Sequence, residues 1–507
     1  MTGPFIDVQV TDGCCTAQGT AAVRLGWAGD ESAPAPWARW HWDGRELRAR
    51  VDPLGFFSLF CFVSDERVML AASPLTLIAR GAPSDLDREA LAVFYRLGYF
   101  LDDDTPFAHI KVLPADGVLN WRPGRWLVAG GPRVVAAERV SPGDVEAGFI
   151  DRFRASVARC VDLAPGRTVL PLTGGRDSRH ILLEMHRQGA APAACVTCNG
   201  SPAGIDGETR AAANLARAVG VGHEVIPAAA SALEAQWRTL GLTHLCADEH
   251  AQMLGLADYT TCHGPTIIEG IGGDILSRNR PREVRLVDAR DRDDWRGVAE
   301  AYLDGQVRAV GFSLEAWLGP REAERLSPRD AVVDRVARGV EAFSGAAEPL
   351  TAFHFWQRTR REIALVPAAL LDGAQAVLCP FIDSELVRFL LSLPDDVTRG
   401  GGLHDRVIAR AYPDWSHLPY HNGRNVTPGG SLRGRVRSAW RGWASVSRDM
   451  PRRAGAEALA VARAARSRVH RRMNVYRLHR VRVCAAAAGG EEVFSSGLRS
   501  RRPAGDR

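Results

Sequence analysis

Two glycine–aspartate loops carry residue types suited to binding phosphate. The first, Thr173–Ser178, reads Thr-Gly-Gly-Arg-Asp-Ser and follows the short apolar run Thr168–Leu172. Consecutive glycines let the backbone turn tightly and bring bare N–H groups close to a ligand. A helix that begins at Ser178 adds unpaired N–H donors and a dipole that favours anions. The pattern predicts a phosphate site with hydroxyl donors from Thr173 and Ser178 on either side.

The aspartates of the two loops indicate a metal ion. Asp177 would repel phosphate unless a cation lay between them, so the first loop implies Mg²⁺. The second loop follows the apolar run Thr266–Glu269 and ends in Asp274. Its glycines are Gly270, Gly272 and Gly273. At the carboxyl ends of parallel strands, where open sheets bind ligands, Asp177 and Asp274 are expected to hold Mg²⁺.

Alternating strands and helices are needed to position these loops. The predicted strands are Thr168–Leu172, Ala193–Cys198, His223–Ile226 and Thr266–Glu269. Helical patterns cover Ser178–Gln188 and Gly207–Val219, the second with Gly220 as its C-cap. This alternation predicts an α/β domain with a parallel sheet over residues 145–430.

Two further regions flank the predicted parallel sheet. Residues 1–140 are predicted to be β-rich, because short apolar runs such as Phe56–Val63 and Arg67–Ala71 are separated by turn residues. Residues 431–507 hold 19 arginines and five acids, a net charge of +14, which leaves −9 for residues 1–430 of a chain whose total is +5. This tail is predicted to be partly helical and disordered at its end.

Composition favours a cytoplasmic enzyme. The chain has 507 residues, 46% hydrophobic and 24% charged, which is ordinary for a soluble protein. The first thirty residues show no basic segment followed by an apolar run, and no apolar run reaches the roughly 20 residues of a membrane span. Nucleic acid is not an expected partner, because the basic tail has few aromatic residues on which bases would stack.

The two loops resemble motifs of one enzyme family. Thr173–Ser178 resembles the S-G-G-x-D-S pyrophosphate loop of N-type ATP pyrophosphatases, and Gly270–Ile275 resembles the G-x-G-x-D-E segment of asparagine synthetases. Cys379–Asp383 is similar to the family's P-F-L-D segment, and Val51–Gly55 and Thr105–Pro114 look like the end of its glutaminase domain. The resemblance covers residues 45–430. It implies an ATP-pyrophosphatase domain preceded by a degenerate Ntn-type glutaminase-like domain.

This resemblance implies an ATP-dependent, AMP-forming amide ligase. A carboxylate is activated as an acyl-adenylate, pyrophosphate leaves, and an amine or ammonia attacks the adenylate. ATP and Mg²⁺ are the implied cofactors, and relatives that form β-lactams or lasso peptides suggest a precursor peptide or biosynthetic-cluster partner. The implied pyrophosphate and metal contacts are Thr173, Gly174, Gly175, Arg176, Asp177, Ser178 and Asp274. Val196 and Thr197 are placed beside the adenine.

Three departures from the family pattern keep other functions open. Thr2 stands where family glutaminases have cysteine, so no glutaminase activity is expected. Lys111 is the only lysine, so the family's late lysine is missing or replaced by Arg424 or His404. Ile271 stands where relatives carry a polar residue. The alternatives are an asparagine synthase proper that uses glutamine or ammonia, a nucleotide-binding pseudoenzyme or partner protein, and a tRNA-modifying enzyme.

Overall fold

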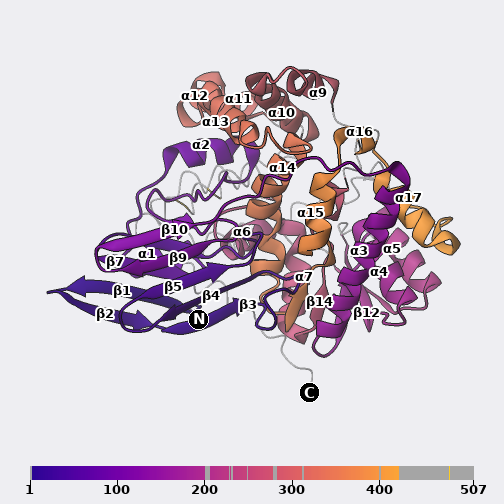
Figure 1. Ribbon diagram of the computed structural model, residues 1–507, viewed down its shortest axis with the longest axis horizontal. Coiled ribbons are helices and arrows are strands. Elements are labelled where there is room, and N and C mark those ends of the chain that lie inside the picture. Colours follow the sequence, from indigo (N-terminus) through magenta and orange to yellow (C-terminus); the bar gives the residue numbers. More distant parts are fainter. Residues whose placement is uncertain are drawn as a thin grey trace, which may run out of the picture.

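The fold is mixed α/β, with two antiparallel five-stranded sheets and one parallel five-stranded sheet (Figure 1). The computed structural model describes residues 3–421 without 200–205, 228, 230–231, 248, 278–282, 311–312 and 399–400, together with His479 and Val483. No helix within these residues is long and apolar enough to cross a membrane. The rest of the predicted Arg-rich tail lies outside the described residues.

The N-terminal region is a pair of packed antiparallel sheets, as its β-rich pattern predicts. The first sheet has the order β2-β1-β7-β6-β8 and the second has the order β10-β9-β5-β4-β3. The strands are β1 (Phe5–Thr11), β2 (Cys14–Gly19), β3 (Ala22–Gly26), β4 (Trp37–Trp42), β5 (Leu47–Val51), β6 (Phe60–Val63), β7 (Arg67–Ala71), β8 (Lys111–Val112), β9 (Val118–Arg122) and β10 (Arg125–Ala129). Val8 and Val68 of one sheet share an apolar cluster with Trp40 and Trp121 of the other.

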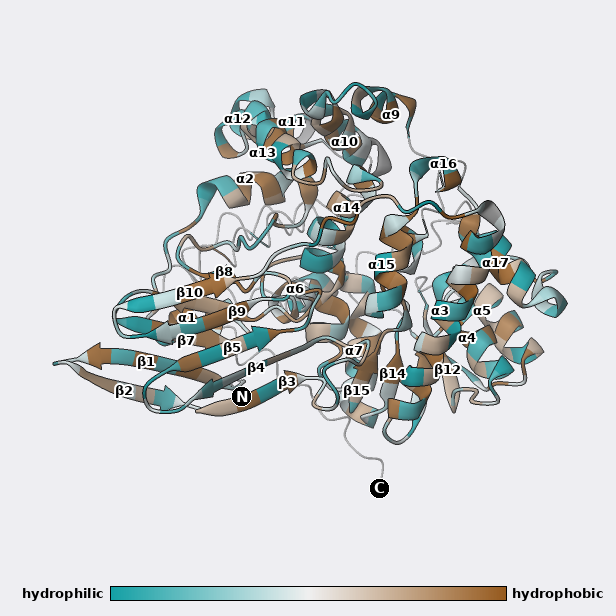
Figure 2. Cartoon of the chain, viewed as in Figure 1, coloured by the Kyte–Doolittle hydropathy of each residue, from teal (hydrophilic) through white to brown (hydrophobic). Residues whose placement is uncertain are grey.

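Each antiparallel sheet has one packed face and one polar or helix-covered face. Along β5, Leu47, Ala49 and Val51 are buried, whereas Arg48 and Arg50 between them are more exposed. Figure 2 shows hydrophilic and hydrophobic segments side by side along the strands of these sheets. Two helices pack on the outer face of the first sheet, α1 (Pro74–Ala79) and α2 (Arg88–Leu97). Their first turns are capped by the side chains of Ser73 and Asp87.

The parallel sheet has the order β13-β12-β11-β14-β15. Its strands are β11 (Thr168–Pro171), β12 (Ala194–Cys198), β13 (His223–Ile226), β14 (Thr266–Ile268) and β15 (Ala376–Leu378). The first four match the predicted strands to within one residue at each end, whereas β15 was not predicted. Both faces are covered, because Val169 of β11 faces one apolar cluster and its neighbour Leu170 faces another.

Helices cover both faces of this sheet, and a further group, α9 to α13, lies beside α2 (Figure 1). Those that follow the first strands are α4 (Asp177–Arg187) and α5 (Gly207–Ala218), close to the predicted bounds, and Gly220 follows α5 with a φ of +75°. The others are α3 (Pro142–Leu163), α6 (Ala232–Leu242), η1 (Ala251–Met253), α7 (Leu254–His263), α8 (Gly273–Leu276), α9 (Val284–Arg290), α10 (Trp295–Val310), α11 (Leu314–Leu318), α12 (Pro320–Leu326), α13 (Arg329–Glu341), α14 (Pro349–His354), η2 (Phe355–Ile363), η3 (Val366–Leu370), η4 (Pro380–Ile382), α15 (Ser384–Ser392), α16 (Asp395–Thr398), α17 (Leu403–Ala411) and η5 (Pro413–Trp415).

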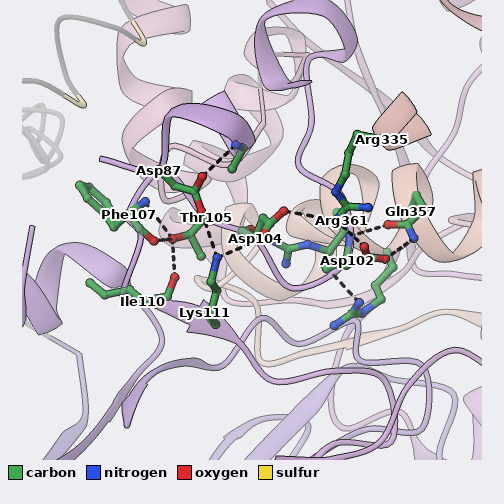
Figure 3. A network of polar contacts seen from close by, with 12 residues as sticks. Asp87, Asp102, Asp104, Thr105, Phe107, Ile110, Lys111, Arg335, Gln357 and Arg361 are labelled. Atoms are coloured by element: carbon green, nitrogen blue, oxygen red, sulfur yellow. Dashed lines mark hydrogen bonds and ion pairs between the residues drawn. The ribbon is translucent and has the colours of Figure 1, made fainter. Parts of the chain in front are cut away.

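A polar network ties the N-terminal sheets to the later helices. Figure 3 shows the loop after α2 meeting side chains of α13 and η2. Gln357 donates to Asp102 at 2.7 Å, Arg335 pairs with the same carboxylate, and Arg361 donates to the carbonyl of Asp104. Lys111 reaches Asp104 at 2.9 Å. The only lysine of the chain therefore has a structural role in this network.

The strand order places a switch point between β11 and β14. From β11 the chain moves to one side for β12 and β13, and then crosses back to form β14 and β15 on the other side. Ligands of open parallel sheets bind at the carboxyl ends of the strands at such a point. The loop Thr173–Ser178 follows β11, and the loop Gly270–Gly273 follows β14. Both predicted loops therefore meet where a ligand is expected.

Candidate functional site

The first loop is held in a tight turn by its own hydroxyl groups. The N–H of Thr173 donates to Ser178 Oγ at 3.0 Å, and the N–H of Gly175 donates to Thr173 Oγ1 at 3.1 Å. Helix α4 begins at Asp177, and Arg176 at its N-cap position makes no side-chain capping bond. The first turn of α4 thus keeps N–H donors for which an anion is a suitable partner.

Asp177 joins the two loops. The N–H of Asp274 donates to Asp177 Oδ2 at 3.0 Å, although the two residues are 97 positions apart. A Cβ on Gly273 would lie 2.6 Å from Asp177 Cγ, and one on Gly270 would lie 3.0 Å from Asp177 Cβ. Both positions require glycine because the aspartate side chain packs directly on the second loop. The sequence pattern placed both glycines but gave no hint of this contact.

The charge of Asp177 is poorly compensated. Its side chain is 25% exposed, and its Oδ1 has no hydrogen-bond partner. Burial raises the pKa of Asp177 well above its usual range, and the nearby negative charges of Asp274 and Glu269 raise it further. Burial also raises the pKa of Glu269, which lies at the end of β14. A cation at this position would relieve both the repulsion and the unpartnered oxygen.

The donor set fits Mg²⁺ better than a metal held by protein alone. Among the described residues, no group of three or more His, Cys, Asp or Glu side chains is arranged to hold a metal ion. Asp177 and Asp274 supply two carboxylates. Mg²⁺ typically binds one or two carboxylates and takes its other ligands from water and substrate phosphates. The predicted pair suits that mode of binding.

His404 is placed beneath the site as a neutral, buried group. Its Nε2 lies 3.0 Å from His180 Nδ1, and its Nδ1 lies 3.2 Å from Ser277 Oγ and 3.5 Å from Asp177 Oδ1. Burial lowers the pKa of His404 to about 3. A neutral imidazole cannot supply the positive charge of the family's lysine. The role of His404 in place of that lysine stays a prediction, and in this structure its ring lies buried between His180, Ser277 and Asp177.

Arg176 points along α17. Its Nη2 donates to Asp405 Oδ2 at 2.9 Å, and its guanidinium lies 5.0 Å from the ring centroid of Tyr420. Arg179 lies 4.0 Å from the same ring and donates to the carbonyls of Leu418 and Pro419. The segment before residue 421 is therefore fastened over the start of α4, which no local sequence signal indicated.

Two further side chains cover the loop. Burial raises the pKa of Glu208, whereas the neighbouring N–H of Gly174 lowers it. His421 donates its N–H to the carbonyl of Gly174 at 3.1 Å. A Cβ on Gly174 would lie 2.4 Å from His421 Cβ, and one on Gly207 would lie 2.6 Å from His421 Cε1. A phosphate that used the N–H of Gly174 would have to displace Glu208.

The two residues predicted beside the adenine, Val196 and Thr197, have buried side chains. Val196 is 1% exposed and belongs to the apolar cluster beside β12. Thr197 is 3% exposed, and its hydroxyl lies 2.8 Å from His223 Nε2. A base at the end of β12 could therefore contact main-chain atoms here rather than these side chains. Arg424 and Thr2 lie outside the described residues.

No protein-family model matches this chain, and no curated protein matches it significantly. The assignment of function therefore rests on the loops, the sheet order and the resemblance of the motifs.

Proposed function

We propose that this protein is an ATP-dependent, AMP-forming amide ligase of the asparagine synthetase type. One observation carries the proposal. Two glycine–aspartate loops, distant in sequence, meet at the switch point of a parallel sheet, where Asp274 donates its N–H to Asp177. Uncapped helix N–H groups stand beside the unpartnered Asp177 Oδ1. Anion donors and metal-binding carboxylates side by side suit a nucleotide triphosphate with its metal.

The finer fold assignment is part of this proposal. We assign the parallel sheet and its helices to an ATP-pyrophosphatase domain, and the two packed antiparallel sheets to a degenerate glutaminase-like domain. The opposed antiparallel sheets and the chain order of the two regions support this assignment. Glutaminase activity is not part of the proposal, because Thr2 replaces the nucleophilic cysteine.

The residues of the loops would act mainly by position and charge. The first turn of α4, with Thr173 and Ser178, binds the pyrophosphate that leaves when a substrate carboxylate attacks the α-phosphorus. Asp177 and Asp274 would hold Mg²⁺, and the metal would supply positive charge to offset that of the phosphates. Glu269 shapes the second loop by accepting the N–H of Ile271 at 2.6 Å. An amine or ammonia then attacks the acyl-adenylate and releases AMP.

The proposal also names the reactants, the partner and the location. A carboxylate and an amine or ammonia are the reactants, and a precursor peptide or another protein of a biosynthetic cluster is the proposed partner. We propose a cytoplasmic location, which suits the supply of ATP.

The test is ATP–pyrophosphate exchange with the full chain, carried out with pools of candidate carboxylates. Wild type should catalyse exchange that depends on Mg²⁺. The variants Asp177→Asn and Asp274→Asn should each lose at least about a hundredfold, since losing a metal ligand costs several kcal/mol of transition-state stabilisation. Asp65→Asn, an exposed acid in the turn between β6 and β7, is the matched control. Exchange at the wild-type rate in either loop variant would rule out the proposed metal site.

One observation favours a second candidate, a nucleotide-binding pseudoenzyme or partner protein. Glu208 and His421 lie against the first loop at Gly174, and burial keeps His404 neutral by lowering its pKa to about 3. A pseudoenzyme would bind ATP with Mg²⁺ but show no exchange with any carboxylate. Binding together with exchange selects the ligase.

A further inference from the structure

The second antiparallel sheet carries a row of arginines on its outer face. Arg24 of β3 lies directly opposite Arg39 of β4, and Arg39 lies directly opposite Arg50 of β5. Arg48 of β5 and Arg122 of β9 lie on the same face. Like charges placed directly opposite destabilise strand pairing. Three adjacent strands therefore place like charges side by side, and nearby acids partly offset them. We call these five residues the arginine face.

The carboxylates around the arginine face are each shared between two arginines. Glu31 contacts Arg24 at 3.2 Å and Arg39 at 3.1 Å, Glu46 contacts Arg122 at 2.9 Å and also Arg48, and Asp116 contacts Arg50 at 3.3 Å and Arg133 at 2.7 Å. Both arginines lower the pKa of Glu46. These six arginines and three acids carry a net charge of +3, to which Arg125, opposite Arg122, and Asp43, near Arg48, add one charge of each sign. Each acid already contacts two arginines, so the remaining positive charge is available to a ligand from another molecule.

This positive surface is open to solvent and differs from the rest of the body. The arginine side chains of the face are between 35% (Arg24) and 63% (Arg48) exposed. Residues 1–430 carry a net charge of −9 in total, whereas the arginine face itself is positive. An exposed field of one sign attracts ligands of the opposite sign and speeds their association.

We propose that the arginine face binds an acidic peptide segment of a partner chain. Glu31, Glu46 and Asp116 each contact two arginines. The spacing of neighbouring arginines therefore suits a carboxylate bound between them. Nucleic acid fits less well, because single strands bind on aromatic platforms. The tryptophans Trp40 and Trp121 of this sheet point inward and are 2% and 0% exposed, and Trp126 of β10, which is 46% exposed, lies opposite Trp121 on the face away from the arginines. The proposal is independent of the ligase assignment.

The test uses the full chain and a short fluorescein-labelled polyglutamate peptide. Wild type should bind the peptide with an affinity that falls as salt rises. The double variant Arg39→Glu with Arg50→Glu should bind at least about tenfold more weakly, since it reverses two charges at the centre of the face. The matched control is Arg292→Glu with Arg321→Glu, two exposed arginines of the helical region. Circular dichroism and thermal melting check that each variant is folded.

The basic tail could also bind polyglutamate, so the site of binding must be mapped. Hydrogen–deuterium exchange of the full chain with and without peptide should show slower exchange over residues 22–50 and 118–122. Equal weakening in both double variants, or protection confined to residues 431–507, would overturn the proposal. A single-stranded oligonucleotide that bound the face more tightly than the peptide would replace the proposed partner class.

Discussion

Replacing Asp177 by Asn separates two effects of this carboxylate: the destabilisation of the free protein by a buried charge, and the binding of ATP with Mg²⁺. In the free protein, Asp177 Oδ1 lacks a hydrogen bond, and burial with the charges of Asp274 and Glu269 raises its pKa. Asn keeps an oxygen for the N–H of Asp274 and removes the charge. Each unit by which folding raises the pKa of a carboxyl group corresponds to about 1.4 kcal/mol of folding stability lost when the group is charged. We expect Asp177→Asn to stabilise the free protein on the order of 1 kcal/mol, a rise of about 1–2 °C in Tm.

Binding of ATP with Mg²⁺ should make wild type more stable than Asp177→Asn. A ligand at a hundred times its Kd stabilises the native state by about 2.7 kcal/mol. Wild type should gain that amount in a thermal-shift assay, whereas Asp177→Asn should gain little. The reasoning would be refuted by a variant that melts below wild type without ligand, or that keeps the full ATP·Mg²⁺ shift.

The free protein should also show a defined pH dependence at this residue. Because the folded pKa of Asp177 is raised, the folded state binds a proton that the unfolded state releases. Its contribution to stability is therefore present near the unfolded value of about 4 and is lost as pH rises through the folded value. The stability difference between Asp177→Asn and wild type should shrink as pH falls toward 4.

Four other outcomes are expected. Asp274→Asn combined with Asp177→Asn should reduce pyrophosphate exchange no more than either change alone, because one metal site is already broken; additive losses would indicate two separate roles. His404→Ala should cost about 2–3 kcal/mol in chemical denaturation, since it opens a cavity and leaves buried groups unpaired. Because its pKa is lowered to about 3, wild type should lose stability as pH falls below about 6.5, and this variant should lose less. His421→Ala should lower the Kd for ATP about threefold or more, since binding no longer displaces the ring; weaker binding would show that the ring contacts the nucleotide. The purified protein should release no glutamate from glutamine, and release that Thr2→Ala abolished would contradict this.

Local patterns predicted the elements that carry the loops. The strands β11, β12, β13 and β14 match runs of apolar residues, because buried parallel strands are apolar on both faces. Helices α4 and α5 follow from apolar spacing and turn residues. The short strand β15 was missed, since its Ala-Val-Leu run is too brief to separate from a buried helical segment.

Contacts between distant residues could not be predicted in the same way. Sequence patterns identified Asp177, Asp274, Gly270 and Gly273, but not that the aspartate side chain packs on both glycines. The buried, neutral state of His404 depends on contacts with His180 and Ser277, which lie far away in the chain. Glu208 and His421 reach the loop only because the fold brings α5 and the end of the described region together.

Calorimetric titration of the full-length protein with ATP tests the central claim most directly. With Mg²⁺ present, wild type should bind one ATP per chain, and chelation of the metal should abolish or strongly weaken the heat of binding. Asp177→Asn and Asp274→Asn should lose this metal dependence, whereas Asp65→Asn should match wild type. Binding that is absent in wild type, or equally strong without Mg²⁺ and in both loop variants, would contradict the account.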